Sequence, residues 1–386
     1  MIDIKDKKDC CGCAACVQRC PKQCISLKTD EEGFLYPKVN ADLCIDCGLC
    51  EKVCPVINQN ANREPLHCFA AYNEDEEVRL KSSSGGVFTL LAEKMIEKGG
   101  VVFGARFDKD WSVVHDFAET KDGLAAFRGS KYLQSRIGNS FAEAERFLKA
   151  GRQVLFSGTP CQIAGLKGFL RKEYEGLLAV EIVCHGVPSP KIWHRYLKEK
   201  QTQMGADRIT NVEFRNKKTG WKRYSFQLEY EKGDRTCIYA EYASQNPYMK
   251  GFLSDIYLRP SCHACPAKHL KSGADITLGD FWGIQHRLPE MDDDKGVCGL
   301  LCNTQKAMAQ FAEISVVQTE CQFLDVAAGN PALLHSVKEP VEKRNRFFSR
   351  LNGRNFEKEV SKYTQVPFKF RVKIFLYNML KGNRKG

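Results

Sequence analysis

Two cysteine-rich runs near the start of the chain restrict its fold and chemistry more than any other feature. Each run has four cysteines spaced as C-x2-C-x2-C-x3-C, and a proline follows the last of them. The cysteines are Cys10, Cys13, Cys16 and Cys20 in the first run and Cys44, Cys47, Cys50 and Cys54 in the second. In bacterial two-cluster ferredoxins the fourth cysteine of such a run binds the cluster of the other run. The spacing therefore predicts two [4Fe-4S] clusters, one held by Cys10, Cys13, Cys16 and Cys54 and the other by Cys44, Cys47, Cys50 and Cys20.

A pair of structural zinc sites is the alternative, because zinc motifs also use C-x2-C pairs. Four cysteines within eleven residues, twice over and each time before a proline, favour iron–sulfur clusters. Between the runs, a turn at Asp30–Gly33 separates two short apolar segments and predicts a β-hairpin. The duplicated unit predicts a ferredoxin-type domain over residues 1–57, followed by a polar linker over residues 58–66.

Composition indicates a soluble protein of a reducing compartment. Hydrophobic residues make up 43% of the 386 residues and charged residues 27%, which is an ordinary globular balance. No apolar run approaches the ~18 residues of a membrane span, and residues 1–9 lack the apolar core of a signal peptide. Nineteen cysteines, at least eight of them assigned to clusters, require a reducing environment. We therefore expect a cytoplasmic protein.

The net charge of +11 is concentrated at the end of the chain. Residues 338–386 carry fourteen Lys and Arg against four Glu, which leaves the other 337 residues at +1. A nucleic-acid partner is not expected, since such proteins spread basic charge over a binding face. We treat residues 338–386 as a basic C-terminal tail. Its segment Val366–Leu380 mixes basic and large apolar residues, so it could lie on an anionic membrane surface or pack on the body of the protein.

From residue 67 onward, strand and helix patterns alternate, which predicts a mixed α/β domain over residues 67–337. With the ferredoxin-like module in front, the chain as a whole is α+β. The expected strands cover residues 68–72, 101–107, 113–118, 153–156, 177–184, 208–214, 224–230, 236–240 and 275–278. The expected helices cover residues 87–98, 140–149, 191–204 and 245–255, with another beginning at Gln162. Beyond residue 302 the pattern is weak.

Four further cysteines follow predicted strands or form a close pair, and we place them in loops beside glycine or proline. They are Cys161, Cys184, Cys262 and Cys265. Their spacing alone leaves three interpretations open: no ligand at all, a third cubane cluster, or a structural zinc. The remaining cysteines, Cys11, Cys24, Cys68, Cys237, Cys298, Cys302 and Cys321, are predicted to be packing residues.

A serine- and glycine-rich segment, Ser82–Gly86, precedes the helix predicted over residues 87–98. It could bind a phosphate at the helix N-terminus or simply cap the helix. The chain contains neither the dinucleotide fingerprint nor the P-loop. His185 and His263 each neighbour a candidate ligand, and His185 is the first candidate for a proton donor.

Several ordered motifs carry a family resemblance. They are GSKYLQS at Gly129–Ser135, FSGTPCQIAGL at Phe156–Leu166, CHGVPSP at Cys184–Pro190, and the block from Cys262 to Gly283 that ends in DITLGDFWG. Together they resemble the family of coenzyme F420 hydrogenase/dehydrogenase β-subunits, with a fused N-terminal two-cluster module, over about residues 10–303.

The resemblance implies a flavin-binding α/β domain with FAD and its own [4Fe-4S] cluster. It favours the third-cluster interpretation for Cys161, Cys184, Cys262 and Cys265. It also implies that Ser83, Ser84, Gly85 and Gly86 bind the FAD diphosphate. The candidates for the rest of the flavin pocket are Lys131, Gln134, Thr159 and Asp280.

These expectations describe an iron–sulfur flavoprotein oxidoreductase. Electrons would pass from ferredoxin, or a similar one-electron donor, through the clusters to FAD and on to an organic acceptor, possibly a deazaflavin such as F420. Two alternatives remain: a non-catalytic electron-transfer subunit of a larger redox complex, and a cluster-based redox sensor that binds its target through the basic tail.

Overall fold

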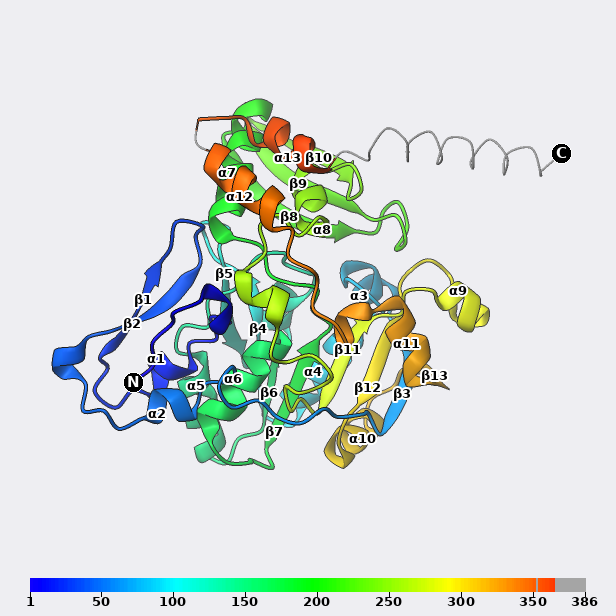
Figure 1. Cartoon of the computed structure of the whole chain (residues 1–386). Coiled ribbons are helices and arrows are strands. Elements are labelled where there is room, and N and C mark those ends of the chain that lie inside the picture. The colour runs from blue at the N-terminus through cyan, green and yellow to red at the C-terminus, as the bar shows by residue number, and fades with distance from the viewer. Residues whose placement is uncertain (352, 365–386) are drawn as a thin grey trace.

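The N-terminal module consists of a β-hairpin flanked by two short helices. The computed structural model describes residues 1–351 and 353–364, and Figure 1 shows the module in blue beside the rest of the chain. Strands β1 (Ile25–Thr29) and β2 (Leu35–Val39) pair antiparallel, as the turn at Asp30–Gly33 predicts. Helices α1 (Ala15–Arg19) and α2 (Leu49–Lys52) follow the first cysteines of the two runs.

An eight-stranded mixed sheet forms the centre of the molecule. Its strand order is β13-β3-β12-β11-β7-β6-β4-β5. In chain order the strands are β3 (His67–Tyr72), β4 (Val101–Phe107), β5 (Val113–Ala118), β6 (Val154–Gly158), β7 (Leu177–Ile182), β11 (Ile276–Asp280), β12 (Cys298–Cys302) and β13 (Val317–Cys321). The four neighbours β4, β6, β7 and β11 are parallel. Ligands of such sheets bind at the carboxyl ends of the strands, so this edge is where a site is expected.

Helices cover both faces of the sheet. On one face lie α5 (Ser140–Lys149) and α6 (Pro160–Leu170), and on the other lie α4 (Val87–Glu97) and α10 (Gln305–Ala312). Helix α5 buries Phe141, Ala144 and Phe147 at helical spacing, which explains why it packs on the sheet. Three shorter helices, α3 (Glu76–Lys81), α9 (Ile284–Arg287) and α11 (Phe323–Gly329), lie near the β3–β12–β13 side (Figure 1).

A second lobe sits beside the carboxyl ends of the parallel strands (Figure 1). Its antiparallel sheet has the order β10-β9-β8, formed by β8 (Arg208–Asn216), β9 (Ser225–Lys232) and β10 (Arg235–Tyr242). Its helices are α7 (Pro190–Met204), α8 (Pro247–Leu253), α12 (Val341–Arg350) and α13 (Phe356–Thr364). Phe347, Phe356 and Val360 of the last two helices are buried in this lobe's aromatic core. The first part of the predicted basic tail therefore belongs to the folded lobe, whereas Val366–Leu380 lies outside the described residues.

Helix α6 joins the N-terminal module to the sheet. A Cβ on Gly165 would lie 2.7 Å from the Cβ of Cys13, and one on Gly168 would lie 2.6 Å from the carbonyl oxygen of Val53. These two glycines let the backbone of α6 approach both cysteine runs. Cys13 and Val53 accordingly share one buried cluster with Phe141 of α5.

Most predicted elements are found, with three differences. Helix α6 begins at Pro160 rather than Gln162, so Cys161 lies in its first turn and not in a loop. Cys262 likewise lies in a short 3-10 helix, Pro260–Ala264. Cys237 and Cys321 are half-buried, unlike the buried Cys11, Cys24, Cys68, Cys298 and Cys302.

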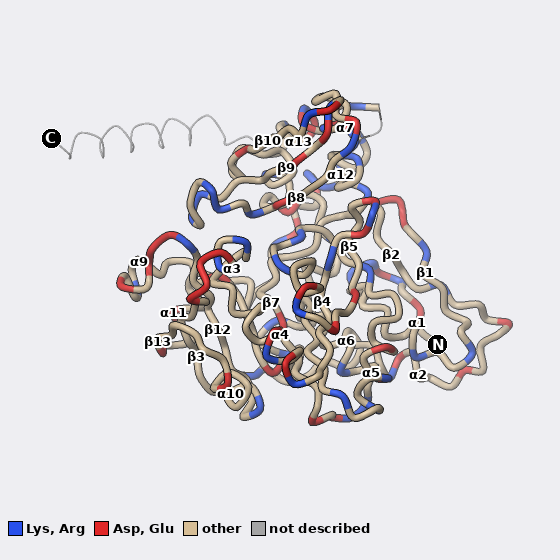
Figure 2. The backbone as a smooth tube through the Cα atoms, turned by 180° about the vertical axis from the view of Figure 1, so that it is seen from behind, with Lys and Arg blue, Asp and Glu red and all other residues tan. Residues whose placement is uncertain are grey.

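Lys and Arg are interspersed with Asp and Glu along the backbone, as Figure 2 shows for the described residues. Among these residues, no helix combines the length and apolar character that crossing a membrane requires.

Candidate functional site

Two cavities in the N-terminal module are lined by its cysteines. One is lined by Cys20, Cys44, Cys47 and Cys50, which we call the outer set, because Cys47 is exposed to solvent. The other is lined by Cys10, Cys13, Cys16 and Cys54, which we call the inner set. Each cavity thus combines three cysteines of one run with the fourth cysteine of the other run. The fold brings together the two predicted ligand sets, and each surrounds a space.

The thiols that line the two cavities contact backbone N–H groups and further cysteines. Over residues 1–351 and 353–364, no group of three His, Cys, Asp or Glu side chains is arranged to hold a metal ion. Backbone N–H groups point at sulfur, since Ile2 donates to Sγ of Cys50 at 3.3 Å and Asp46 donates to Sγ of Cys44 at 3.4 Å. A fifth cysteine lines each cavity: Cys24 in the outer one, with Sγ 3.3 Å from that of Cys20, and Cys11 in the inner one.

The four later cysteines, which we call the third set, come together at the carboxyl edge of the sheet. Cys161 follows β6 and Cys184 follows the neighbouring strand β7, while Cys262 and Cys265 come from the 3-10 helix region. Burial raises the pKa of Cys184 well above its usual value, and the nearby thiols of Cys262, Cys161 and Cys265 raise it further. Burial likewise raises the pKa of Cys262 to about 12 and that of Cys265 to about 11. Such thiols favour the neutral form unless a cation binds them.

The inner and third sets adjoin each other. The thiol of Cys11 lies beside those of Cys13 and Cys161, whose contacts shift its pKa. Arg259 places Nη2 3.5 Å from Sγ of Cys10, and its own carbonyl accepts a hydrogen bond from the N–H of Cys262 at 2.9 Å. The three cysteine sets therefore follow one another from the exposed outer set, through the inner set, to the third set at the sheet edge.

The serine–glycine segment lies at the same edge of the sheet. Strand β3 runs parallel to β11, because both pair antiparallel with β12, so its carboxyl end at Tyr72 faces the same side. Asn73 N–H donates to the carbonyl of Gly85 at 2.7 Å, which holds the segment there. Ser83 Oγ lies 2.8 Å from Ser130 Oγ and joins this segment to the loop that carries Lys131. Gly86, with φ of 82°, is the N-cap of α4 and provides no side-chain cap, and the N–H of Gly85 donates to Sγ of Cys298 at 3.2 Å.

Two buried basic residues, Arg215 and Lys217, lie beside this segment, and no sequence motif indicated them. Arg215, in β8, forms an ion pair with Asp280 at the end of β11, and Trp221 Nε1 donates to the same carboxylate at 2.8 Å. Nε and Nη2 of Arg215 are buried and have no hydrogen-bond partner in the described part of the chain. Lys217 donates to the carbonyls of Ser84 and Lys295, and burial lowers its pKa to about 7.

The other predicted pocket residues lie in three different environments. Burial lowers the pKa of Lys131 to about 7, and its ammonium donates to the carbonyl of Arg128 at 2.9 Å. Thr159 caps α6 with its Oγ1 3.3 Å from Sγ of Cys161, so it lies at the third set. Gln134 donates to the carbonyl of Cys11 and accepts from Arg259, which places its side chain at the inner set.

His185 follows Cys184 and is half-buried. Its Nε2 lies 2.6 Å from Oδ1 of Asp255, and its ring contacts Phe252 edge-on with centroids 5.4 Å apart. His263 Nδ1 instead faces the carbonyl of Val337 at 3.1 Å, as a structural histidine would. Of the two, only His185 combines partial exposure with a carboxylate partner.

Comparisons with known proteins identify the families that the chain matches. Residues 68–140 match the family model described as coenzyme F420 hydrogenase/dehydrogenase, beta subunit N-term, and residues 151–322 match the model for the C terminus of that subunit. Residues 9–58 match a 4Fe-4S dicluster domain.

Three individual proteins illustrate the similarity. The chain is 24% identical to a subunit of the F(420)H(2) dehydrogenase of Methanosarcina mazei over 287 residues, which covers 70% of this chain and 75% of that protein. Its first part is 42% identical to a ferredoxin of Mycolicibacterium smegmatis over 55 residues, 14% of this chain and 41% of the ferredoxin. A solved chain from the F420-reducing [NiFe] hydrogenase complex of Methanosarcina barkeri aligns at 19% identity with a TM-score of 0.46, covering 67% of this chain and 83% of that one.

Proposed function

Because this chain belongs to the family of coenzyme F420 hydrogenase/dehydrogenase β-subunits and carries a 4Fe-4S dicluster domain, we propose that it is an iron–sulfur flavoprotein oxidoreductase. It takes electrons from ferredoxin or a similar one-electron donor and delivers them, through FAD, to an organic acceptor such as a deazaflavin. The observation that carries the proposal is the succession of three cysteine sets from an exposed entry point to the carboxyl edge of the sheet.

Each cysteine set is proposed to hold one [4Fe-4S] cluster. The outer set is Cys20, Cys44, Cys47 and Cys50, the inner set is Cys10, Cys13, Cys16 and Cys54, and the third set is Cys161, Cys184, Cys262 and Cys265. The two N-terminal cavities, each lined by cysteines of both runs, support the crossed ligand assignment. The raised pKa values of the third set support metal binding, since bound iron would stabilise the thiolates.

The residues at the sheet edge fit the anionic diphosphate of FAD. Nε and Nη2 of Arg215 are buried donors without acceptors among the described residues, and α4 begins without a capping side chain. A buried donor without a partner costs about 1–3 kcal/mol, and a diphosphate would supply the missing acceptors. Ser83, Ser84, Gly85 and Gly86 would contact it together with Arg215 and Lys217, while Lys131 and Asp280 would line the pocket.

Bound FAD would collect single electrons from the clusters and release them as a pair. Thr159 and Cys161 lie at the start of α6, so flavin and third cluster would meet at the ends of neighbouring strands. His185, held by Asp255, is the proposed proton donor.

A second candidate function is that of a subunit that feeds electrons to a partner enzyme without turning over an acceptor itself. The name of the Methanosarcina mazei relative, which describes it as one subunit of a dehydrogenase, favours this function. In that case the chain would assemble with other subunits.

Anaerobic turnover separates the two functions. The chain is mixed with reduced ferredoxin, and oxidised F420 or another candidate acceptor is added in excess. Continuous reduction of the acceptor is expected for the oxidoreductase. If the clusters become reduced and no acceptor is then turned over, the result indicates the electron-transfer subunit instead. If reduced ferredoxin does not reduce the clusters, the result contradicts both functions.

A further inference from the structure

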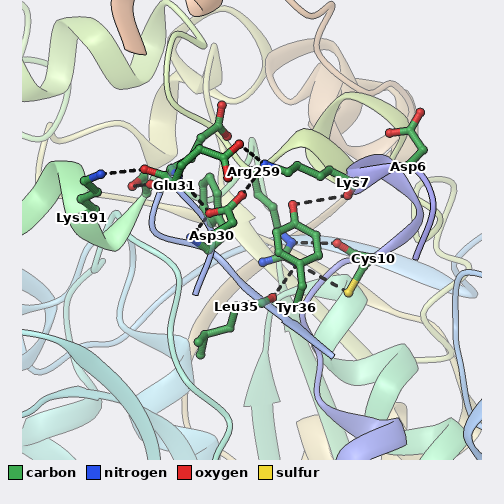
Figure 3. Close-up of polar contacts among 12 residues, drawn as sticks. Asp6, Lys7, Cys10, Asp30, Glu31, Leu35, Tyr36, Lys191 and Arg259 are labelled. Atoms are coloured by element: carbon green, nitrogen blue, oxygen red, sulfur yellow. Dashed lines mark hydrogen bonds and ion pairs between the residues drawn. The ribbon is translucent and has the colours of Figure 1, made fainter. Parts of the chain in front are cut away.

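Arg259 is a buried cation at the junction between the N-terminal module and the sheet domain. Its side chain is fully buried, with 0% exposure. Nε donates to the carbonyl of Cys10 at 2.8 Å, Nη2 to the carbonyl of Leu35 at 2.9 Å, and Nη1 to the amide oxygen of Gln134 at 2.9 Å. Nη2 also lies 3.5 Å from Sγ of Cys10, as Figure 3 shows.

This guanidinium has no negative side chain to balance it. Across the described residues, no Asp or Glu oxygen lies within 4.0 Å of Arg259, and every oxygen that it contacts is neutral. The rings of Tyr36 and Phe34, at 4.3 and 5.5 Å from its Cζ, supply cation–π attraction but no negative charge. A buried charge is strongly unfavourable unless it is paired.

Another buried arginine at the same junction is paired with a carboxylate, as buried charges usually are. Arg344 is 2% exposed, donates to the carbonyl of Leu258, and forms an ion pair with Glu32 of the N-terminal hairpin. The carboxylate of Glu32 thus balances the charge of Arg344. The charged group that Arg259 does face is the inner cysteine set, which is negative once its four thiolates hold a cluster.

The outer set has no equivalent cation among the described residues. Lys22 lines its cavity but is exposed to solvent, and the N-terminal ammonium of Met1 pairs with Asp46 and Glu51 at the surface. Water and salt screen such exposed charges, whereas a fully buried guanidinium is screened much less. Cluster potentials depend on net charge, on hydrogen bonds to sulfur and on solvent exposure, so two clusters with near-identical ligand spacing have different surroundings here.

We propose that Arg259 is the counter-charge of the inner cluster and raises its reduction potential above that of the outer cluster. A positive neighbour stabilises the reduced, more negative state. With clusters bound, one electron would then pass from the reduced outer cluster to the oxidised inner cluster, with no proton or further reactant involved. The electron would then lie next to the third set, because the carbonyl of Arg259 accepts a hydrogen bond from the N–H of Cys262. This inference rests on the proposed clusters and adds a positioning residue to them.

Redox titration followed by electron paramagnetic resonance tests the proposal on the full chain. The variants are Arg259→Gln, Arg259→Lys and the matched control Arg344→Gln, and iron is counted in each. Cys13→Ala and Cys47→Ala identify the signals of the inner and outer clusters. We expect Arg259→Gln to lower the midpoint of the inner cluster and leave that of the outer cluster unchanged. Arg259→Lys should lie closer to wild type, and Arg344→Gln should match wild type.

Each other result has a defined meaning. A fully loaded Arg259→Gln protein with unchanged midpoints overturns the proposal, as does an equal fall in Arg344→Gln. If Arg259→Gln loses the inner cluster, Arg259→Lys decides. If Arg259→Lys keeps full iron content and a near-native midpoint of the inner cluster, the charge at this position is what matters. If Arg259→Lys also loses iron, Arg259 has a purely structural role. A wild-type chain without the two N-terminal clusters would instead contradict the proposed function, whatever Arg259 does.

Discussion

The thiol of Cys265 lies near those of Cys161, Cys184 and Cys262, and its backbone N–H donates to Ser336 Oγ at 3.0 Å. If the third set holds a cluster, Cys265→Ala should lose one cluster, about four of about twelve irons. The two N-terminal clusters should keep their signals, because their ligands lie in separate cavities. Iron analysis and electron paramagnetic resonance check this. Cys237→Ala, at a half-buried position in β10, is the control and should lose no iron. Full iron content in Cys265→Ala would remove Cys265 from the ligands.

Site residues that belong to a motif of fixed spacing could be predicted from the sequence. Site residues whose partners are distant in the chain could not. The cysteine runs indicate their chemistry locally, so the sets around both cavities could be named from sequence. Arg259 is 249 positions from Cys10 in the chain, and Arg215 is 65 positions from Asp280. The sequence around an arginine does not indicate whether its side chain will be buried without a carboxylate partner. Gln134 was expected at the flavin, but its hydrogen bonds to Cys11 and Arg259 place it at the inner set.

At the scale of the element, α6 positions the N-terminal module against the sheet. Gly165→Ala would add a Cβ 2.7 Å from Cβ and 2.9 Å from Sγ of Cys13. We expect it to lower the free energy of unfolding by about 1–3 kcal/mol, as overpacking does, and to speed iron loss from the inner cluster. Melting temperature and chelator-driven bleaching measure both. Gly176→Ala, whose Cβ would come no nearer than 3.3 Å to another atom, is the control. Equal stability and bleaching in the two variants would contradict this role of α6.

The strands and helices that position the site followed from sequence because each has a strong local pattern. The hairpin, the pair β4 and β5, and helices α4, α5 and α7 are found close to their predicted bounds. The start of α6 was missed although Thr159-Pro160 is a common opening, with a capping residue before a proline at the first helical position. Strand β13 was missed because it is an edge strand with alternating exposed residues.

For the whole molecule, the order of the three cysteine sets is the feature that spacing could not supply. Spacing names the members of each set, whereas their succession depends on how the N-terminal module packs on α5 and α6. Two glycines on α6 and the buried Arg259 and Arg344 contribute to that packing. Part of the predicted basic tail also proved to be a structural element, since α12 and α13 complete the second lobe.

The measurement that tests the proposed electron path most directly is a joint count of iron, sulfide and flavin in the chain purified without oxygen. We predict about twelve irons, from three four-iron clusters, and one FAD per chain. About eight irons without flavin would contradict the third cluster and the flavin-dependent reaction together.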